Sequence, residues 1–303
     1  MQARSTHYFM LLALGMIWGS SFPLLKVALE SLTPVSAAAF RLTLAAIAMT
    51  AVIYALGLRL TPNWKTWKHY FVVAFVGNVL PFLLICWAEQ FIDAALASVL
   101  MGLVPLATMV AAHFFTSDEK ITANKLVGVI LGGCGVVVLI GIDVLGEIGS
   151  YALAQLGIVA AACCYGVSTV YVRRSKITDF NPLSNAAGIL ICSSLLSLPL
   201  AFIFESPTTL HITDRSLIAT TVLALVCTCA AYFLLYSLLA QVGATFTSYN
   251  NYLVPVFGML VSVVLLDEPI QNSTYIALVL IFSGLLISQR KSRNAHPPHP
   301  ISS

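Results

Sequence analysis

The sequence contains few charged residues for its length. Only 9% of its 303 residues are Asp, Glu, Lys or Arg, and 59% are apolar, whereas a soluble domain carries about 25% charged residues. A water-soluble fold cannot hide so much apolar surface. The composition therefore excludes an ordinary soluble enzyme or binding domain, and a net charge of +3 gives no reason to expect a nucleic-acid partner.

Long polar segments are also missing. The apolar residues occur in runs separated by short polar breaks, and about 20 such residues let a helix cross the roughly 30 Å of membrane hydrocarbon. A membrane β-barrel would instead show strands of about ten residues that alternate apolar and polar. The pattern predicts an all-α integral membrane protein. Its ten transmembrane helices are expected at residues 8–29, 35–57, 69–90, 95–116, 123–142, 151–172, 183–204, 216–239, 246–266 and 273–288.

Lysine and arginine are scarce in every second loop. With the N-terminus inside, twelve of the fifteen fall in inside segments, and the outside loops hold only Arg215. Because these residues are retained on the cytoplasmic side, we expect a multi-pass protein of the bacterial inner (plasma) membrane with both termini cytoplasmic. Residues 289–303 are predicted to form a disordered cytoplasmic tail.

The usual signatures of catalysis are absent. The seven cysteines all fall inside predicted helices without the paired spacing of a zinc site, and neither a His-Glu-x-x-His motif nor a pair of mid-helix aspartates occurs. We therefore expect no catalytic residue, metal or cofactor. No Asp or Glu lies near the middle of a predicted helix, so a proton relay built on a buried carboxylate is not expected. A uniporter, an exchanger or coupling through another group is left open.

The second half of the sequence repeats the first. At an offset of 150 residues, Ser98 matches Ser248 and Pro105 matches Pro255, and at an offset of 147 the pair Trp18-Gly19 matches Tyr165-Gly166. The repeats are predicted to cover residues 8–142 and 151–288. Since each has five helices, an odd number, the second copy should enter the membrane from the opposite side. Inverted-topology repeats of this kind are typical of alternating-access carriers.

The repeated motifs resemble those of the drug/metabolite transporter superfamily, in particular its EamA-type members. The residues that carry the resemblance are Trp18 to Phe22, Arg41, Ala97-Ser98, Val104-Pro105 and Asp118-Glu119, with their repeats Ser248 to Pro255, Asp267-Glu268 and Gly284. The resemblance implies ten helices, of which the first, third and fourth of each half line a central cavity and the fifth lies at the periphery. It also implies that bacterial relatives are mostly exporters of amino acids or related metabolites.

Mid-helix polar and aromatic side chains are the candidates for lining this cavity, because polar groups in hydrocarbon are costly. For Asn78 the alternative is an interhelical hydrogen bond, and for the aromatic residues it is ordinary packing. Residues 248, 251, 252 and 255 have the spacing of one helix face, as do the matching positions 98, 101, 102 and 105. The candidates are Trp18, Ser21, Asn78, Phe82, Ser98, Met101, Tyr165, Tyr232, Ser248, Asn251 and Tyr252.

Five other residues are candidates for gating. Pro105 and Pro255 each free a backbone carbonyl and bend a helix, although a static kink is the alternative. Lys26, Arg41 and Glu89 lie toward the outer ends of their helices. There an ion pair could close a gate, or a cation could hold a substrate carboxylate. The alternative for the two cations is to snorkel to the membrane interface.

These observations favour a secondary carrier that moves small metabolites, such as amino acids or their derivatives, by alternating access in the efflux direction. Efflux of drugs or amphipaths, or import of a nucleotide-like or sugar metabolite, is left open. The expected partners are the small-molecule substrate and the lipid bilayer, and a homodimer is left open. A membrane-embedded enzyme lacks its ionisable cluster, and a receptor or scaffold lacks the soluble domain it would need.

Overall fold

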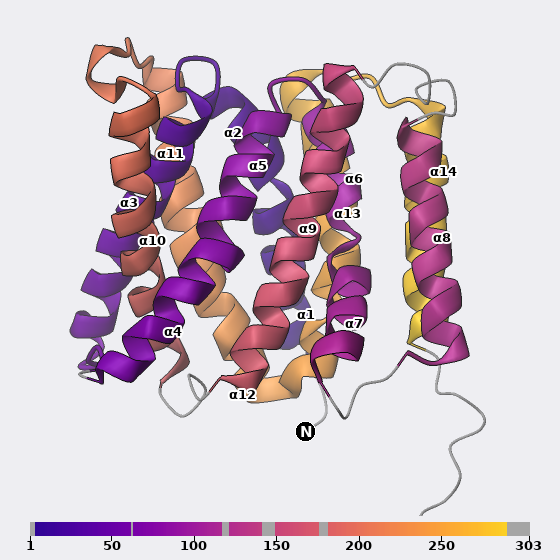
Figure 1. Cartoon of the computed structure of the whole chain (residues 1–303), viewed down its shortest axis with the longest axis horizontal. Coiled ribbons are helices and arrows are strands. Elements are labelled where there is room, and N and C mark those ends of the chain that lie inside the picture. Colours follow the sequence, from indigo (N-terminus) through magenta and orange to yellow (C-terminus); the bar gives the residue numbers. More distant parts are fainter. Residues whose placement is uncertain (1–3, 62, 117–120, 141–148, 176–180, 290–303) are drawn as a thin grey trace, which may run out of the picture.

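The computed structural model describes residues 4–61, 63–116, 121–140, 149–175 and 181–289, which form helices and turns without a strand. The helices lie side by side in one bundle (Figure 1). We call the side on which the first helix begins the lower face and the opposite side the upper face, as Figure 1 is drawn. The predicted disordered tail, apart from Gln289, lies outside the described residues.

Each half of the chain supplies its own series of helices. The elements of the first half are α1 (Ser5–Gly19), α2 (Ser21–Ala28), α3 (Pro34–Ala55), α4 (Trp64–Ala74), η1 (Phe75–Val79), α5 (Leu80–Ala88), α6 (Ala94–Met101), α7 (Val104–Phe115) and α8 (Ala123–Ile140). Those of the second half are α9 (Ser150–Arg174), α10 (Pro182–Phe204), η4 (Pro207–Thr209), α11 (Asp214–Ala224), η5 (Leu225–Ala230), α12 (Ala231–Thr247), α13 (Asn250–Leu266) and α14 (Asn272–Ser288).

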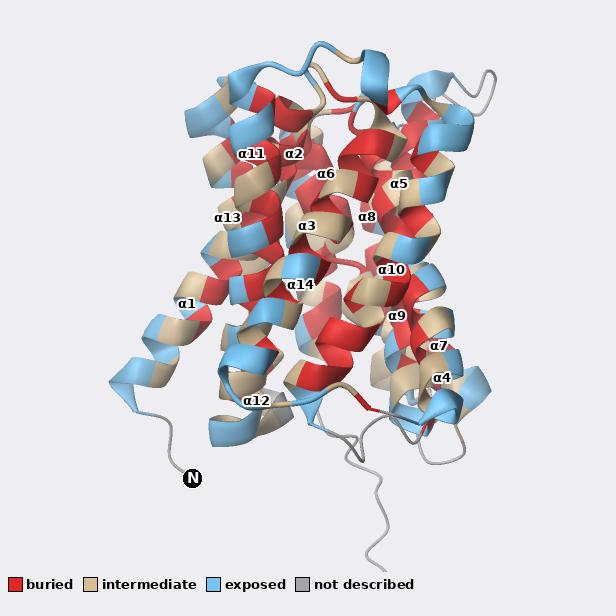
Figure 2. Ribbon diagram, turned by 90° about the vertical axis from the view of Figure 1, so that its left-hand side faces the viewer, coloured by how far each residue is buried: buried red, intermediate tan, exposed pale blue. Residues whose placement is uncertain are grey.

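The helices have the length and surface of membrane spans. Among the described residues, seven helical stretches are long and apolar enough to cross a bilayer, and three shorter apolar helices accompany them, at Ala123–Leu139, Asn250–Leu266 and Asn272–Ser288. Large apolar side chains face outward, with Phe9 73% and Val264 83% exposed, while the buried residues line the inside of the bundle (Figure 2). Such an apolar exterior suits lipid and not water.

Two predicted spans are each broken into two helices. The first is interrupted at Ser20, and the fourth at Gly102 and Leu103. Pro105 then lies in the first turn of α7, where a missing backbone N–H leaves no intrahelical bond unmade. The expectation of one continuous helix face over positions 98 to 105 is therefore wrong, because the chain restarts its helix within that face.

The corresponding face of the second half is also interrupted. Helix α13 begins at Asn250, so Ser248 lies in the turn before it. Pro255 lies inside α13, whereas its repeat mate Pro105 opens a helix. The single face predicted for positions 248 to 255 therefore holds only from Asn251 onward.

A π-helical segment lies in the third span of each half. Segment η1 covers Phe75–Val79 and η5 covers Leu225–Ala230. The two begin 150 residues apart, so Asn78 and Thr228 occupy equivalent positions. Since π-helical turns re-aim side chains and are frequent at functional sites, both halves present a polar group at the same place.

Helix contacts between the halves come in matching pairs. Helix α1 packs on α13, and its equivalent α9 packs on α6 and α7; α3 packs on η5, and α10 packs on η1. Helices α3 and α10 pack on each other, as do α8 and α14 at one edge of the bundle (Figure 1). Each of these contacts has a counterpart when every helix is replaced by its equivalent in the other half.

Candidate functional site

A buried arginine lies where the halves meet. Arg41 of α3 is only 7% exposed, and its Nε donates a hydrogen bond to Oγ1 of Thr228 in η5, 3.2 Å away. The guanidinium carbon lies 4.4 Å from the centre of the Phe82 ring, a cation–π contact. Arg41 therefore does not snorkel to the interface but turns into the bundle, where second-half Thr228 and first-half Phe82 hold it.

The outer edge of this guanidinium is unused. Within the described chain, the two terminal nitrogens of Arg41 make no hydrogen bond or ion pair, and neither is among the fully buried polar atoms without a partner. Both therefore keep some accessible surface. A guanidinium edge presents two parallel N–H donors that match a carboxylate. The arrangement can bind a small anionic group inside the bundle.

Two tyrosines share this space. Tyr165 of α9 and Tyr232 of α12 pack against the same apolar core as Phe82, and both side chains keep part of their surface accessible. We call Arg41, Phe82, Tyr165, Thr228 and Tyr232 the Arg41 cluster. It combines one cation, one hydroxyl anchor and aromatic walls, which is the usual make-up of a small-molecule site. The sequence analysis did not identify Thr228 as a candidate, although the repeat places it at the position equivalent to Asn78.

The upper ends of several helices are tied by charged side chains. The Lys26 ammonium donates to the backbone carbonyls of Glu89, at 2.8 Å, and Ile92, at 2.5 Å. The Glu268 carboxylate accepts hydrogen bonds from the backbone N–H groups of Ala94 and Ala95, both at 3.0 Å. These charges satisfy free groups at helix ends. The predicted ion pair between Glu89 and a cation is not formed: among the described residues the ion pair present is Arg215–Glu30.

A second acid from the second half performs the same task as Glu268. Glu205, after α10, accepts hydrogen bonds from the backbone N–H groups of Val35 and Ser36 at 3.1 and 2.8 Å, and from the hydroxyl groups of Thr33 and Ser36. It thereby caps the first turn of α3, the helix that carries Arg41. The sequence placed this acid in an outside loop and gave it no role.

Glu89 itself is fully buried. Its side chain is 0% exposed, and neither carboxyl oxygen has a hydrogen-bond partner in the part of the chain described. The sequence analysis placed Glu89 toward the outer end of its helix as a gating candidate, and it expected no proton relay because no Asp or Glu lies near the middle of a span. Glu89 lies at the end of a span, yet it is fully buried there.

Several predicted cavity residues make hydrogen bonds between or within helices. The Asn78 amide donates to Ser193 Oγ of α10 at 3.0 Å, which is the alternative that the sequence left open for it. Ser98 donates to the Ala95 carbonyl at 2.7 Å, with the Pro255 carbonyl 3.5 Å away. Ser21 donates to the carbonyl of Trp18.

The remaining candidates make other contacts. Trp18 packs with the small core formed by α1 and α12. Met101, at the end of α6, and Tyr252 border the main core that also contains Phe82. The Tyr252 ring packs on Phe282 of α14, with centroids 5.5 Å apart. Ser248 and Asn251 are half-buried near the start of α13.

The repeated tryptophan-glycine and tyrosine-glycine motifs have a packing explanation. A Cβ added at Gly19 would lie 2.6 Å from the backbone nitrogen of Gly258 in α13, and one added at Gly166 would lie 2.8 Å from that of Thr108 in α7. Gly258 and Thr108 are themselves 150 residues apart. Each first helix thus approaches the fourth helix of the other half through a glycine, where a larger residue would not fit.

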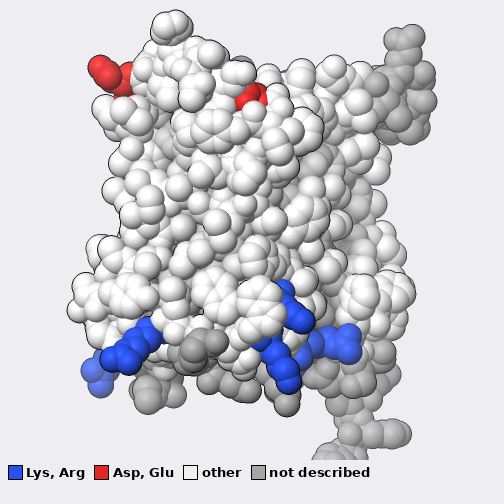
Figure 3. Space-filling view, turned by 60° about the vertical axis from the view of Figure 1, so that its left-hand side comes forward, with Lys and Arg blue, Asp and Glu red and all other residues white. Residues whose placement is uncertain are grey.

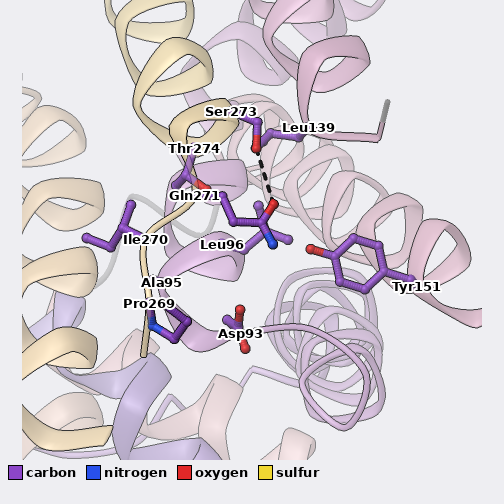
Figure 4. Close-up of a pocket in the computed structure, with 10 residues that line it drawn as sticks. All are labelled: Asp93, Ala95, Leu96, Leu139, Tyr151, Pro269, Ile270, Gln271, Ser273 and Thr274. Atoms are coloured by element: carbon purple, nitrogen blue, oxygen red, sulfur yellow. Dashed lines mark hydrogen bonds between the residues drawn. The ribbon is translucent and has the colours of Figure 1, made fainter. Parts of the chain in front are cut away.

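A separate small pocket, of about 10 Å³, lies at the upper face. Figure 4 shows the Tyr151 hydroxyl pointing toward the Gln271 side chain, with Asp93 below them. Gln271 is tied to the Ser273 hydroxyl at 3.5 Å. None of the predicted cavity or gating residues lines this pocket, so it is distinct from the Arg41 cluster.

The family model for the EamA-like transporter family matches residues 5–141 and 152–289. The chain belongs to this family. Membership indicates a multi-pass membrane transporter rather than an enzyme. The family match falls on both halves, in agreement with the sequence repeat.

Relatives of this EamA-family protein carry transporter names. It is 29% identical over 275 residues to an uncharacterized transporter of Archaeoglobus fulgidus, covering 90% of this chain and 95% of that one. It is 25% identical over 284 residues to a protein of Escherichia coli named a probable amino-acid metabolite efflux pump, covering 90% and 91%. A solved protein structure matches with a TM-score of 0.67 at 20% identity, over 95% of this chain and 98% of that one; it supports the fold alone.

Proposed function

We propose that the protein is an inner-membrane secondary carrier that exports small metabolites bearing a carboxylate, such as amino acids or their derivatives, by alternating access. The observation that carries the substrate class is the unused guanidinium edge of Arg41, held inside the bundle between residues of both halves. The efflux direction rests on the name of the Escherichia coli relative. In this proposal the exported compound carries a carboxylate group that binds Arg41.

We further propose ten spans in two inverted five-helix repeats. The three shorter apolar helices would complete the ten. Support comes from the helix pairs named above, each of which has a counterpart on exchange of the halves, and from the helix directions, since α1 begins at the lower face and α9 at the upper face (Figure 1). In such a carrier the substrate site lies where the repeats meet, and the Arg41 cluster has that location.

The lower face is proposed to be cytoplasmic. Lys and Arg gather along the lower edge of the face drawn in Figure 3, and the acidic residues that it shows lie at the upper edge. Lys and Arg are enriched on the cytoplasmic side of inner-membrane proteins. Reporters fused before α1, at the N-terminus, and after α14 should both report the cytoplasm, and reporters on opposite sides would refute an even number of spans.

Counterflow with purified protein in liposomes tests the carrier function. Liposomes loaded with one unlabelled compound are diluted into its labelled form, with amino acids, nucleosides, sugars and cationic dyes as the panel. The proposal expects uptake of amino acids above that of empty liposomes. Faster exchange of dyes, or of sugars and nucleosides, would favour one of the alternative cargoes, and no exchange of any compound would refute the carrier.

A further inference from the structure

Glu89 differs from two other acids of the described chain, the half-buried Glu205 and the buried Glu268. Glu205 and Glu268 accept hydrogen bonds from backbone N–H groups at helix starts. Both carboxyl oxygens of Glu89 are buried and accept none from any described residue. The Glu89 side chain caps no helix among the described residues, so capping does not explain why an acid occupies this position.

Three charged side chains on neighbouring elements lie around the Glu89 carboxyl, and the Cys86 thiol of α5 is also close to it. The charged groups are Lys26 on α2, Glu268 after α13 and Arg41 on α3. The Lys26 ammonium is already bonded to the carbonyls of Glu89 and Ile92, and neither cation forms an ion pair with the carboxyl in the described structure. The carboxyl therefore has cations nearby but no direct counter-charge.

An ionised carboxylate in this position would be costly. Removing a charge from water without a partner costs several kcal/mol, whereas a protonated carboxyl avoids most of that penalty. The enclosed position of Glu89 in this conformation therefore favours a protonated carboxyl over a carboxylate.

The surroundings of Glu89 also change when the carrier opens upward. Glu268 belongs to the second half and holds the start of α6, which follows Glu89 in the first half, through Ala94 and Ala95. If the halves separate at the upper face, this tie breaks, and the space around Glu89 becomes open to water. The carboxyl can then exchange its proton with the outer compartment.

We propose that Glu89 is a proton-binding site, and that its proton competes with the ammonium group of a zwitterionic substrate, so that the carrier exchanges one proton for one amino acid. In this step the O–H bond of Glu89 breaks, the proton leaves to the solvent, and the substrate ammonium replaces it as the counter-charge of the carboxylate. The substrate carboxylate binds the open edge of Arg41. No electron is transferred, and no other reactant is needed. The inference rests on the proposed amino-acid export and adds its coupling.

Proton-driven transport in liposomes tests the coupling separately from the carrier function. The probe is the labelled amino acid that gives the fastest counterflow, and the membrane potential is held at zero with potassium and valinomycin. Wild-type liposomes with an acidic lumen should accumulate it, up to about tenfold for each unit of pH difference. Glu89→Gln should abolish this accumulation while counterflow at saturating substrate stays above that of empty liposomes. Glu30→Gln, at the half-exposed ion pair with Arg215, is the matched control and should accumulate like the wild type.

The outcomes separate the two proposals. Absent counterflow in the wild type would refute the carrier. Counterflow without any response to pH, accumulation only with an alkaline lumen, or unchanged accumulation by Glu89→Gln would each refute proton exchange at Glu89. Proton release provides a second readout that needs no membrane: adding the same amino acid to purified wild-type protein in weakly buffered detergent should release protons to a pH dye. Release that persists undiminished in Glu89→Gln, or no release from the wild type, would overturn the inference.

Discussion

Gly128 of α8 and Gly284 of α14 face each other reciprocally. A Cβ added at either glycine would lie 2.6 Å from the carbonyl oxygen of the other. The repeat extends the relationship, because Gly135, which matches Gly284 at an offset of 149, approaches the carbonyl of Ala277, and Ala277 matches Gly128 at the same offset. Small residues let membrane helices pack backbone to backbone, and here they hold the fifth helix of each half against the other.

Gly128→Ala is therefore expected to weaken the packing of α8 on α14. The added methyl group would overlap the Gly284 carbonyl and force the helices apart, at a cost of about 1–3 kcal/mol. The thermal midpoint of the purified protein, followed by size-exclusion chromatography after heating, should fall. Gly133→Ala in the same helix is the control, since nothing lies within 4 Å of its added Cβ, and it should keep or raise the midpoint. Equal midpoints for both variants would contradict the close approach.

Arg41→Ala is expected to impair transport of amino acids more than it impairs the fold. Loss of a charge-assisted bond to the substrate carboxylate costs about 1.5–3 kcal/mol, so the substrate concentration at half-maximal counterflow should rise roughly tenfold or more. Arg41→Lys should lie in between, because it keeps the charge but loses the planar donor edge. Counterflow over a range of amino-acid concentrations measures the effect.

Thr228→Val provides the matched control for Arg41. It removes the 3.2 Å hydrogen bond to Nε but leaves the cation and the Phe82 ring in place. We therefore expect a smaller rise in the substrate concentration at half-maximal counterflow, corresponding to about 1 kcal/mol. If Arg41→Ala and Thr228→Val changed half-saturation equally, or Arg41→Ala changed only the thermal midpoint, Arg41 would serve packing and not substrate binding.

Much of the helical architecture could be predicted from the sequence, because the apolar runs and their Pro, Asn and Asp breaks are local signals. The predicted span 183–204 corresponds to α10, Pro182–Phe204, and the span 273–288 to α14, Asn272–Ser288. The interruptions at Ser20 and at Gly102 could not be placed, since they depend on which backbone groups neighbouring helices satisfy. The π-helical segments η1 and η5 leave no mark in hydropathy.

The site was harder to predict, because burial at the end of a span depends on the neighbouring helices. Arg41 and Glu89 have the sequence positions of interfacial residues, and only the packing of α2, α3 and α5 shows that one turns inward and the other is enclosed. Tyr252 has the spacing of a cavity residue but packs on peripheral α14. The spacing of residues along a helix determines which side chains share a face, but it does not determine which neighbouring element that face contacts.

The hydrogen bond between Asn78 and Ser193 is expected to stabilise the contact between η1 and α10. A membrane-embedded bond of this kind is worth about 0.6 kcal/mol on average, so Asn78→Ala and Ser193→Ala should each lower the thermal midpoint slightly. The double variant should lose less than the sum of the two single losses, because the same bond is counted twice. Strictly additive losses would mean that the two side chains act independently. A strong loss of counterflow in Asn78→Ala alone would instead assign Asn78 to the substrate site.

Glu268 is expected to hold the upper face closed. Its carboxylate accepts hydrogen bonds from the N–H groups of Ala94 and Ala95, so it joins the chain after α13 to the start of α6 and places a negative charge at a helix N-terminus. Glu268→Ala leaves these two donors without their acceptor, and the loss of a helix cap costs about 0.5–2 kcal/mol.

The consequence for Glu268→Ala is a lower thermal midpoint together with a changed maximal rate of counterflow, because the closed state that it stabilises is one of the two through which the carrier cycles. Asp267→Asn is the matched control: Asp267 is the preceding residue, is exposed, and has a left-handed φ of 53°, a conformation that Asn adopts as readily as Asp. It makes no such cap, and both readouts should stay at the wild-type level. If the two variants lost stability equally, the effect would belong to the turn after α13 and not to the tie between the halves. A Glu268→Ala variant with normal stability and an unchanged rate would show that the closed upper face does not depend on this carboxylate.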